Sequence, residues 1–525
     1  MNAFDFLKQG DHLGGGANVR PTDAPKNEAR IENGLIDTIT VREFGEKAAA
    51  VPTAAATAAV TATRPAPSGK LRVLLCGTYP IGQSNGYSRV MYYISKYLGR
   101  KDDLALTIYG FQNYKQTAGS QARNDIPSSV MLHDALAHEE PKRHGFGEKE
   151  IGAYLRANPQ DIVVIFNDMV ITSSLTQNIV ETLTPEERRQ FKLLSYMDQV
   201  YPYQKRAYLD ILNTYFDGVI AFTPYWQGVV RSLGLKDSIP TYFFPHGFDS
   251  KLYFPVARKV ARVYHSLPQN AFIVLNLNRN QPRKRWDLTI IAFAQVVKKY
   301  LDAEANGAAG GADGAGRRPI RLLVGTAMNG FWDLMEVYEY ELKRLGVNTE
   351  VGKQFLLPLA NAQQLSDMDI NLLYNACDIG LNTCEGEGFG LCQFEHAAIG
   401  CPQVAPNIGG FKEFLIDGVN STLVPAKWRY HIDKQRDGIG GVAEVCDPTD
   451  VADAIWKYYT NPKLVLKHGN AARKHILTHY PWEPIVDIMY RILKKNKVHV
   501  QHECNGAIRR VPGPEVHEGR STESM

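Results

Sequence analysis

The sequence predicts an α/β protein with parallel sheets, arranged in two domains. Short continuous apolar segments, such as residues 71–76, 162–166 and 271–277, are typical of strands buried on both faces. Helical patterns alternate with these segments, an order that places helices over both faces of a parallel sheet. The chain has 525 residues, which is sufficient for two domains of ordinary size plus terminal segments.

The composition excludes several functional classes. The 59 Lys and Arg against 55 Asp and Glu give a net charge of +4, too small to indicate a nucleic-acid partner. The seven cysteines form no Cys-x-x-Cys pair, which favours reduced thiols and a cytoplasmic location. Cys384, Cys392 and Cys401 do not have the spacing of a standard zinc site.

The first part of the chain does not have the pattern of a folded domain. Residues 1–69 contain a glycine run at 14–16 and an Ala/Thr/Val tract at 48–66, and they are predicted to be a disordered extension. Pro52 and Pro65 interrupt the tract, which also lacks the roughly 20 apolar residues that a spanning helix needs. It is therefore interpreted as a linker and not as a signal peptide.

The first domain begins with a predicted strand at 71–76, a glycine-containing loop at 77–86 and a helix at 87–98. Further strands are predicted at 104–109, 130–133, 162–166, 191–196 and 218–223, with helices near 147–157, 169–182, 204–215 and 224–234. Ligands bind at the carboxyl ends of such strands, where Asp168 and Asp198 follow. Asp168 is interpreted as the N-cap of the next helix, whereas a functional role and ordinary loop chemistry both remain open for Asp198.

The second domain begins with the strand at 271–277. Arg279 and Lys284 lie in the basic loop that follows it, a position that favours a phosphate-binding role over a solvated loop. A glycine-rich insertion is predicted at 301–318, before a strand at 320–324. Asp367 and Asp369 form an Asp-x-Asp, but Ser366 and Asp367 precede a helix at 370–377, so capping is preferred to metal binding.

The segment 381–395 carries the densest functional signal. A strand at 379–383 is followed by Gly386, Gly388 and Gly390, which are expected to take left-handed angles and approach a ligand, and then by a helix from Leu391. Amides at the start of that helix favour an anion. Glu387 and Glu395 flank this position, and carboxylates are useful there only if they face neutral hydroxyl groups. A nucleotide sugar has that layout.

The segment resembles the signature of retaining glycosyltransferases with the GT-B fold, in particular glycosyltransferase family four. The resemblance depends on Glu387 and Glu395 seven residues apart with glycines between them, and on the downstream segments 400–402, 409–413 and 417–419. It implies two Rossmann-like domains facing across a cleft: residues 70–256 for the acceptor and 257–480 for the donor. It also implies a returning helix within 481–498, leaving 499–525 as a loose tail.

The resemblance further implies roles for individual residues. Arg279 and Lys284 match cations that hold the donor diphosphate, with the amides of Phe389, Gly390 and Leu391. Gly388 lies in the same loop. Glu387 would hold the sugar hydroxyls and Glu395 the ribose.

Other residues match the family less closely. Gly86 matches the second glycine of a donor-loop pair, and Asp198 a position facing the acceptor. Arg285 stands where the family mostly has glycine. His246 is interpreted as a structural residue of the turn between the domains.

The implied function is transfer of a hexose, with retention, from a nucleotide-diphosphate sugar such as UDP-glucose or GDP-mannose to a glycan, lipid or protein acceptor. No cofactor and no metal is expected. Alternatives are a silent nucleotide-sugar-binding scaffold, a phosphorylase or epimerase, and a glycosidase using Glu387 and Glu395. The cations Arg491, Lys494 and Lys495 form either a solvated helix face or a peripheral membrane contact.

Overall fold

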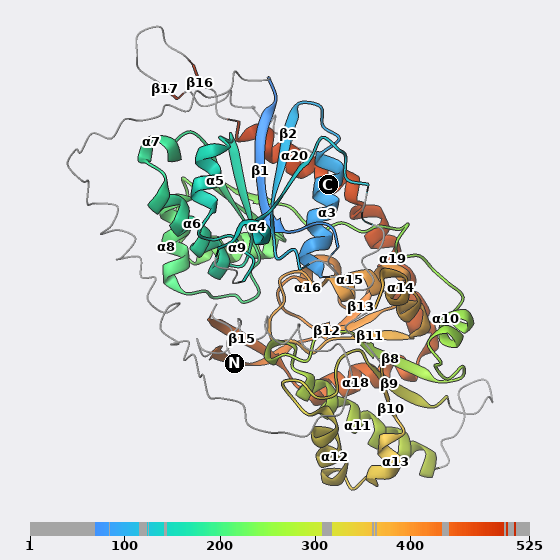
Figure 1. The fold of residues 1–525 in the computed structure, drawn as a ribbon. Coiled ribbons are helices and arrows are strands. Elements are labelled where there is room, and N and C mark those ends of the chain that lie inside the picture. Colours follow the sequence, from blue (N-terminus) through green and yellow to red (C-terminus); the bar gives the residue numbers. More distant parts are fainter. Residues whose placement is uncertain are drawn as a thin grey trace, which may run out of the picture.

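The computed structural model describes residues 69–82, 85–114, 123, 125–140, 144–306, 318–359, 362, 365–432, 440–497, 500–501 and 509–510. Nearly all of the predicted N-terminal extension, most of the C-terminal tail and residues 307–317 of the predicted insertion lie outside these ranges. Figure 1 shows two lobes, one drawn in blue to green and one in yellow to orange, each built around a sheet.

The first lobe contains a seven-stranded parallel sheet with the order β3-β2-β1-β4-β5-β6-β7. Val73 on the central strand β1 lies opposite Leu106 of β2 on one side and Ile162 of β4 on the other. Its strands are β1 (Leu71–Thr78), β2 (Leu104–Phe111), β3 (Met131–Asp134), β4 (Ile162–Asn167), β5 (Lys192–Met197), β6 (Gly218–Ala221) and β7 (Thr241–Phe243). Its helices are α3 (Gly86–Leu98), α4 (Ala135–His138), α5 (Ile151–Ala157), α6 (Met169–Thr182), α7 (Pro185–Arg188), α8 (Arg206–Tyr215) and α9 (Pro224–Ser232).

The second lobe contains a six-stranded parallel sheet with the order β10-β9-β8-β11-β12-β13. Val274 of β8 lies opposite Leu322 of β9 and Ile379 of β11. Its strands are β8 (Phe272–Asn276), β9 (Ile320–Val324), β10 (Leu356–Pro358), β11 (Ile379–Leu381), β12 (Gln403–Pro406) and β13 (Ser421–Val424). The accompanying helices are α10 (Arg258–Tyr264), η1 (Pro282–Lys284), α11 (Trp286–Ala305), α12 (Leu334–Arg344), α13 (Thr349–Lys353), α14 (Asp367–Ala376), α15 (Leu391–Ile399), α16 (Phe411–Phe414), α18 (Pro448–Tyr459), α19 (Pro462–His479) and α20 (Trp482–Lys495).

Both sheets have the doubly wound strand order, in which the chain leaves the first strand in one direction and later returns to its other side. The order reverses between β1 and β4 in one sheet and between β8 and β11 in the other. Ligands of such folds bind outside the carboxyl ends of the strands, at this reversal. The predicted α/β class with two Rossmann-like domains is confirmed.

Several elements differ from the prediction. The helix α11 continues to Ala305, so the first residues of the predicted insertion at 301–318 are helical. An antiparallel hairpin of β14 (Ala426–Ile432) and β15 (Gly441–Cys446) follows the second sheet and was not predicted. Beyond it, a short pair joins β16 (Val500–Gln501) and β17 (Arg509–Arg510) within the predicted loose tail.

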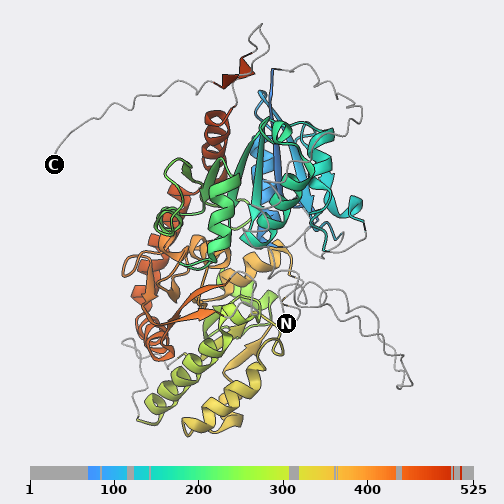
Figure 2. The same cartoon turned by 90° about the vertical axis from the view of Figure 1, so that its left-hand side faces the viewer.

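The last long helix, α20, returns to the first lobe and packs against α3. Figure 2 shows this helix in red beside the blue-to-green lobe. Lys494 pairs with Asp103 at 2.6 Å, and Tyr490 donates to the same carboxylate at 2.8 Å. The ammonium of Lys495 lies 6.0 Å from the centroid of the Tyr242 ring. Two of the cations that were considered for a membrane contact are therefore in contact with the first domain.

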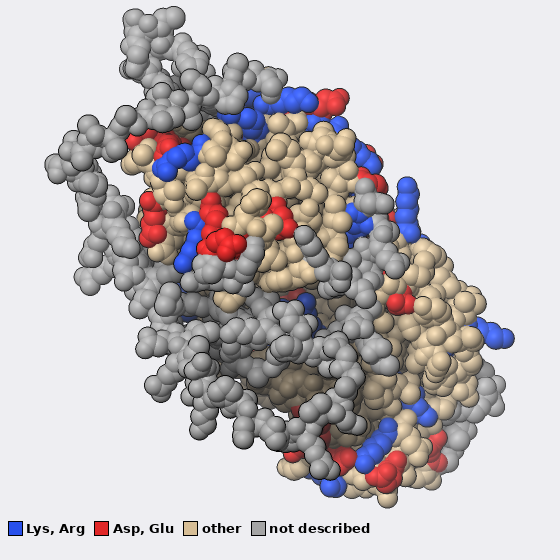
Figure 3. Space-filling view, viewed as in Figure 1, with Lys and Arg blue, Asp and Glu red and all other residues tan. Residues whose placement is uncertain are grey.

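The surface offers no single strongly basic face in the view of Figure 3, where side chains of both signs are scattered over the described residues. Within the same described part of the chain, no helix is long and apolar enough to cross a membrane. The thiols of Cys76, Cys377, Cys384, Cys392, Cys401 and Cys446 are free.

Candidate functional site

The glycine loop joins β11 to α15 at the reversal point of the second sheet. Gly390 has φ +94°, the left-handed conformation that favours glycine, and it directly precedes α15. The prediction of left-handed angles is wrong for Gly386 and Gly388. They are needed for a different reason: a Cβ at Gly386 would overlap the Tyr201 ring, and one at Gly388 would overlap the Asp198 carboxylate. These glycines allow the first domain, and not only a ligand, to approach the loop.

Glu387 lies in this loop and is held by cations of its own domain. Lys284 donates to its Oε2 atom, and Arg283 Nη1 lies 3.5 Å from the same oxygen. Arg283 also donates to the Gly386 carbonyl at 2.6 Å. Burial alone would raise the pKa of Glu387, but the charges of Lys284 and Arg283 outweigh it and hold the pKa below its usual value. Glu387 is therefore an ionised carboxylate at neutral pH.

The cations come from the loop after β8, as the sequence predicted for Arg279 and Lys284. Lys284 ends η1 and reaches Glu387, whereas Arg279 lies at the exposed start of the same loop. Sequence reasoning missed Arg283, although it is part of the same basic run. As a cation in a basic loop, Arg283 was a possible site residue, but its spacing did not match the positions that the family resemblance implies.

Arg285 has φ 50° and ψ 51°, which is the left-handed region that is unfavourable for residues with a β-carbon. Glycine, which the resemblance leads us to expect at this position, would adopt this conformation without strain. The arginine compensates with ion pairs: Nη2 to Asp287 at 2.8 Å and Nη1 to the buried Glu385 at 3.1 Å. The substitution thus adds a link between this loop and the glycine loop while keeping the backbone turn.

The first domain contributes Asp198, directly after β5. Its Oδ2 atom accepts a hydrogen bond from the hydroxyl of Tyr87. Burial raises the pKa of Asp198, against the opposing effect of this bond. Since Asp198 also lies against Gly388, the structure places it beside the glycine loop. Tyr87 was not predicted, because nothing in its local sequence distinguishes it from a core aromatic residue.

Gly86 begins α3 at the reversal point of the first sheet. A Cβ at this position would lie 2.9 Å from the Leu391 side chain, so the starts of α3 and α15 meet here. Trp226 of α9 adds a second contact, since its indole nitrogen donates to the Gly388 carbonyl at 2.7 Å. The site is therefore formed where both domains touch the same loop.

Glu395, the second glutamate of the motif, lies on α15 and faces the first domain. Its Oε1 atom pairs with Arg89 of α3, and its Oε2 atom accepts from Tyr374 at 3.2 Å. Burial raises the pKa of Glu395, against the lowering effect of Arg89. Arg89 also pairs with Asp367 at 2.9 Å. Sequence reasoning missed Arg89, because the pair joins residues 306 positions apart.

Asp168 and Ser366 cap helices as predicted, whereas Asp367 does not. Asp168 is the N-cap of α6 and accepts from the Val170 amide at 2.9 Å, as predicted. Ser366 caps α14 in a reciprocal arrangement with Asp369. The capping interpretation is wrong for Asp367, which is already inside the helix and directs its carboxylate toward Arg89.

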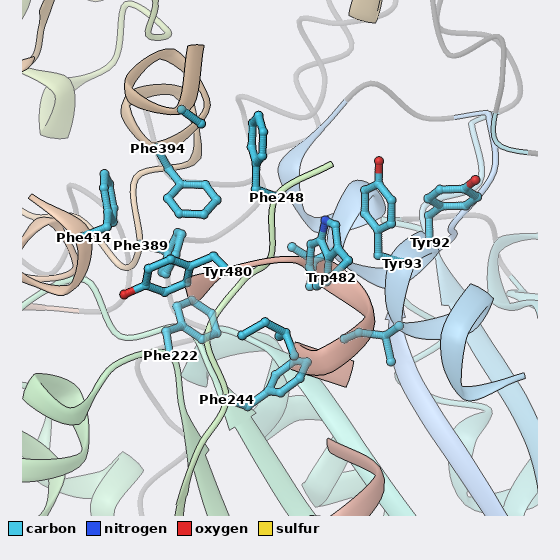
Figure 4. Close-up of a cluster of buried hydrophobic side chains, with 14 of the residues drawn as sticks. Tyr92, Tyr93, Phe222, Phe244, Phe248, Phe389, Phe394, Phe414, Tyr480 and Trp482 are labelled. Carbon is cyan, nitrogen blue, oxygen red and sulfur yellow. The ribbon is translucent and has the colours of Figure 1, made fainter. Parts of the chain in front are cut away.

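Phe389 and His246 belong to an aromatic cluster at the domain junction. Phe389 is 3% exposed, and its ring lies 5.1 Å from Phe394 and 4.6 Å from His246. Figure 4 shows Phe389, Phe394 and Phe414 of the second domain near Phe222 and Phe244 of the first. The Phe389 side chain is thus part of the core, and only its backbone can serve a ligand. His246 is buried among these rings, and burial lowers its pKa to about 3.

Comparisons with known proteins agree with this geometry. Residues 258–475 match the family model described as glycosyl transferases group 1. A D-inositol 3-phosphate glycosyltransferase of Gordonia bronchialis is 28% identical over 244 residues, which cover 46% of this chain and 44% of that protein. One of Mycolicibacterium smegmatis is 30% identical over 180 residues, 34% of this chain and 35% of that protein. The chain therefore spans under half the length of these curated relatives.

Solved structures share the fold over a longer part of the chain. Sucrose-phosphate synthase from Thermosynechococcus elongatus superposes with a TM-score of 0.57 at 16% identity, over 81% of this chain and 98% of that one. Anabaena Alr3699/HepE in complex with UDP and glucose gives a TM-score of 0.56 at 17% identity, over 81% and 99%. The chain thus has the GT-B fold, and its residues 258–475 are similar to the glycosyl transferases group 1.

Proposed function

We propose that the protein transfers a hexose from a nucleotide-diphosphate sugar to an acceptor with retention at the anomeric carbon. The observation that carries this proposal is the arrangement around Glu387. An ionised carboxylate, two cations and the start of α15 converge on one glycine loop, and Asp198 of the first domain lies against the same loop. Such an arrangement suits a ligand that combines hydroxyl groups with a diphosphate.

Different residues would bind the diphosphate and the sugar of the donor. Arg279 and Lys284, with the amides of Phe389 to Leu391, would hold the diphosphate and stabilise the charge that develops on the leaving group. Glu387 would accept hydrogen bonds from the sugar hydroxyls. The departing phosphate would take the acceptor proton, so the proposal needs neither a protein nucleophile nor a metal.

Glu395 would accept the ribose hydroxyls, but both of its oxygens already have partners. Oε1 is held by Arg89 and Oε2 by Tyr374. Each carboxylate oxygen can accept about two hydrogen bonds, so the ribose hydroxyls would use the acceptor positions that Arg89 and Tyr374 leave.

The relatives suggest which substrates to test first. Relatives from Gordonia bronchialis and Saccharomonospora viridis are named D-inositol 3-phosphate glycosyltransferase, so an inositol phosphate is a candidate acceptor. An Anabaena Alr3699/HepE structure contains UDP-glucose, which makes this donor a first choice, with GDP-mannose as the second. Glycans, lipids and proteins remain the other acceptor classes.

The experiment incubates the full chain with UDP-glucose or GDP-mannose, with and without inositol 3-phosphate. We expect slow hydrolysis of the donor by water, transfer of the hexose to the acceptor when it is present, retained anomeric configuration by NMR, and unchanged rates after chelation. If the donor binds and no hydrolysis occurs, the protein is a silent nucleotide-sugar-binding protein. Loss of activity on chelation, or inversion of the anomeric carbon, would contradict the proposed mechanism.

A further inference from the structure

The first domain contains a cavity of about 140 Å³ that the donor site does not use. It lies between the loop that follows β5 and the helices α8 and α9. Leu209, Leu212, Val230 and Leu233 form an apolar wall. The polar part of the lining comes from Gln199, Gln204 and Arg206, whose guanidinium group also bonds Asp210 at 3.0 Å. An internal cavity of roughly 150 Å³ accommodates a molecule of the size of benzene. The space is thus sufficient for a small group of a ligand.

Two polar atoms of this lining have no partner among the described residues: Oε1 of Gln199 and Nε2 of Gln204. Both side chains are buried, with exposed fractions of 0% and 8%. Gln199 Nε2 donates to the Tyr201 carbonyl at 3.1 Å, which fixes the amide orientation and leaves Oε1 as the unused acceptor. Because buried polar groups in proteins are almost always hydrogen-bonded, these two atoms indicate a bound molecule.

The pair of atoms specifies the chemistry of that molecule. It needs an N–H or O–H group for Gln199 Oε1 and an oxygen acceptor for Gln204 Nε2. A secondary amide supplies both groups, and the apolar wall suits a methyl group beside them. An acetamido group has this composition. At the rim of the cavity, Tyr203 is 41% exposed, and its ring offers a flat face to a sugar ring.

The loop after β5 that lines this cavity also contacts the glycine loop. Gln199 directly follows Asp198, and Tyr201 of the same loop closely approaches Gly386 of the glycine loop. The Tyr203 ring lies 6.1 Å from His431 of the β14–β15 hairpin, which belongs to the second domain. A ligand held here would therefore be on the first-domain side of the donor.

We propose that this cavity binds the acetamido group of the acceptor, which is a glycan containing an N-acetylhexosamine. The proposal rests on the proposed function for its acceptor role, while the binding itself is independent of catalysis. Gln199 accepts from the amide N–H, Gln204 donates to the amide carbonyl, and the methyl group packs against the leucines and Val230.

Saturation-transfer NMR on the full chain, with UDP present to occupy the donor site, tests the binding directly. The probes are the methyl glycosides of N-acetylglucosamine, glucosamine and glucose, together with N-methylacetamide. We expect the strongest transfer at the acetyl methyl protons of the first probe and little signal from the second and third. Equal signals from the glucose and N-acetylglucosamine glycosides would overturn the proposal. Stronger binding of N-methylacetamide than of the sugar would replace it with recognition of a peptide amide.

Variants then assign the polar contacts. Gln204→Leu should weaken N-acetylglucosamine glycoside binding by about tenfold, the effect of one buried hydrogen bond. The exposed Gln190→Leu is the matched control. Donor hydrolysis should be unchanged in both, so a defect in transfer chemistry is distinguished from a defect in this cavity. Unchanged glycoside affinity in folded Gln204→Leu would contradict the assignment, and the wild-type methyl signal still decides the proposal if that variant does not fold.

Discussion

Glu387 and Glu395 end the same short motif, but the structure places them in different surroundings. Glu387 is bound by Lys284 and Arg283, which belong to its own domain. Glu395 is bound by Arg89, which belongs to the other domain. The cations lower the pKa of Glu387, whereas burial raises the pKa of Glu395 despite Arg89. One carboxylate is therefore prepared within the donor domain, and the other depends on contact between the domains.

The difference predicts opposite contributions to stability with pH. The folded-state pKa of Glu387 is below 4.5, so its contribution is present above that value and is lost as the pH falls through the folded pKa. The folded-state pKa of Glu395 is above 4.5, so its contribution is present below that value and is lost as the pH rises through the folded pKa. Ionisation of Glu395 at neutral pH therefore lowers the stability of the folded protein, even with Arg89 as the partner of its carboxylate.

Breaking the cross-domain pair should have the largest effect. Arg89→Ala leaves the buried carboxylate of Glu395 and the partly buried one of Asp367 without this partner, and we expect a loss of about 3–5 kcal/mol in unfolding free energy. Protonation of Glu395 relieves the unpaired charge, so the deficit measured by urea unfolding should be smaller at pH 5 than at pH 7. The exposed Arg100→Ala is the control. An equal deficit at both pH values would show that Glu395 does not carry the effect.

Removal of the Glu387 carboxylate should lower turnover without affecting the contact between the two domains. Glu387→Gln is expected to lower kcat for donor hydrolysis roughly 10²–10³-fold, the usual cost of one preorganised transition-state contact. Affinity for UDP, measured by titration calorimetry, should change little. The exposed Glu350→Gln serves for comparison. A variant with normal kcat would remove Glu387 from its proposed role.

Lys284→Ala tests the diphosphate end of the site independently of the sugar end. It should weaken UDP binding by about 1.5–3 kcal/mol, which corresponds to a charge-assisted hydrogen bond. The remaining affinity should depend less on salt than that of the wild type, because one cation is missing. Lys298→Ala on the exposed face of α11 is the matched change. Wild-type affinity with an unchanged salt dependence would place the diphosphate elsewhere.

The smallest expected effect concerns the turn at Arg285. Arg285→Gly and Arg285→Ala both remove the ion pairs to Asp287 and Glu385, but only glycine relieves the left-handed backbone. We expect the glycine variant to be more stable than the alanine variant by about 1 kcal/mol in urea unfolding. Equal stabilities would mean that this turn carries no strain.

The prediction of the fold succeeded where the local signal was strong and failed where elements were short. Long apolar strands such as β1 and β4 and the helix α15 were found, since their patterns extend over enough residues. β10 has three residues, and the hairpin β14–β15 is largely exposed along β14, so neither showed a clear pattern. Among the side chains that the structure brings together around the glycine loop, Lys284, Glu387 and Glu395 were predicted from their motif, whereas Tyr87, Arg89 and Arg283 were not.

The sequence by itself determined the alternation of strands and helices, the glycine loop with its two carboxylates, and the basic loop that faces it. These features depend on residues close in the chain, whose apolar period, backbone freedom and charge act locally. Only the tertiary structure decided what each carboxylate meets. Arg89 and Glu395 are 306 positions apart, and Gly388 is glycine because Asp198 of the other domain lies against it. Such contacts depend on how two independently wound sheets meet, which no local pattern encodes.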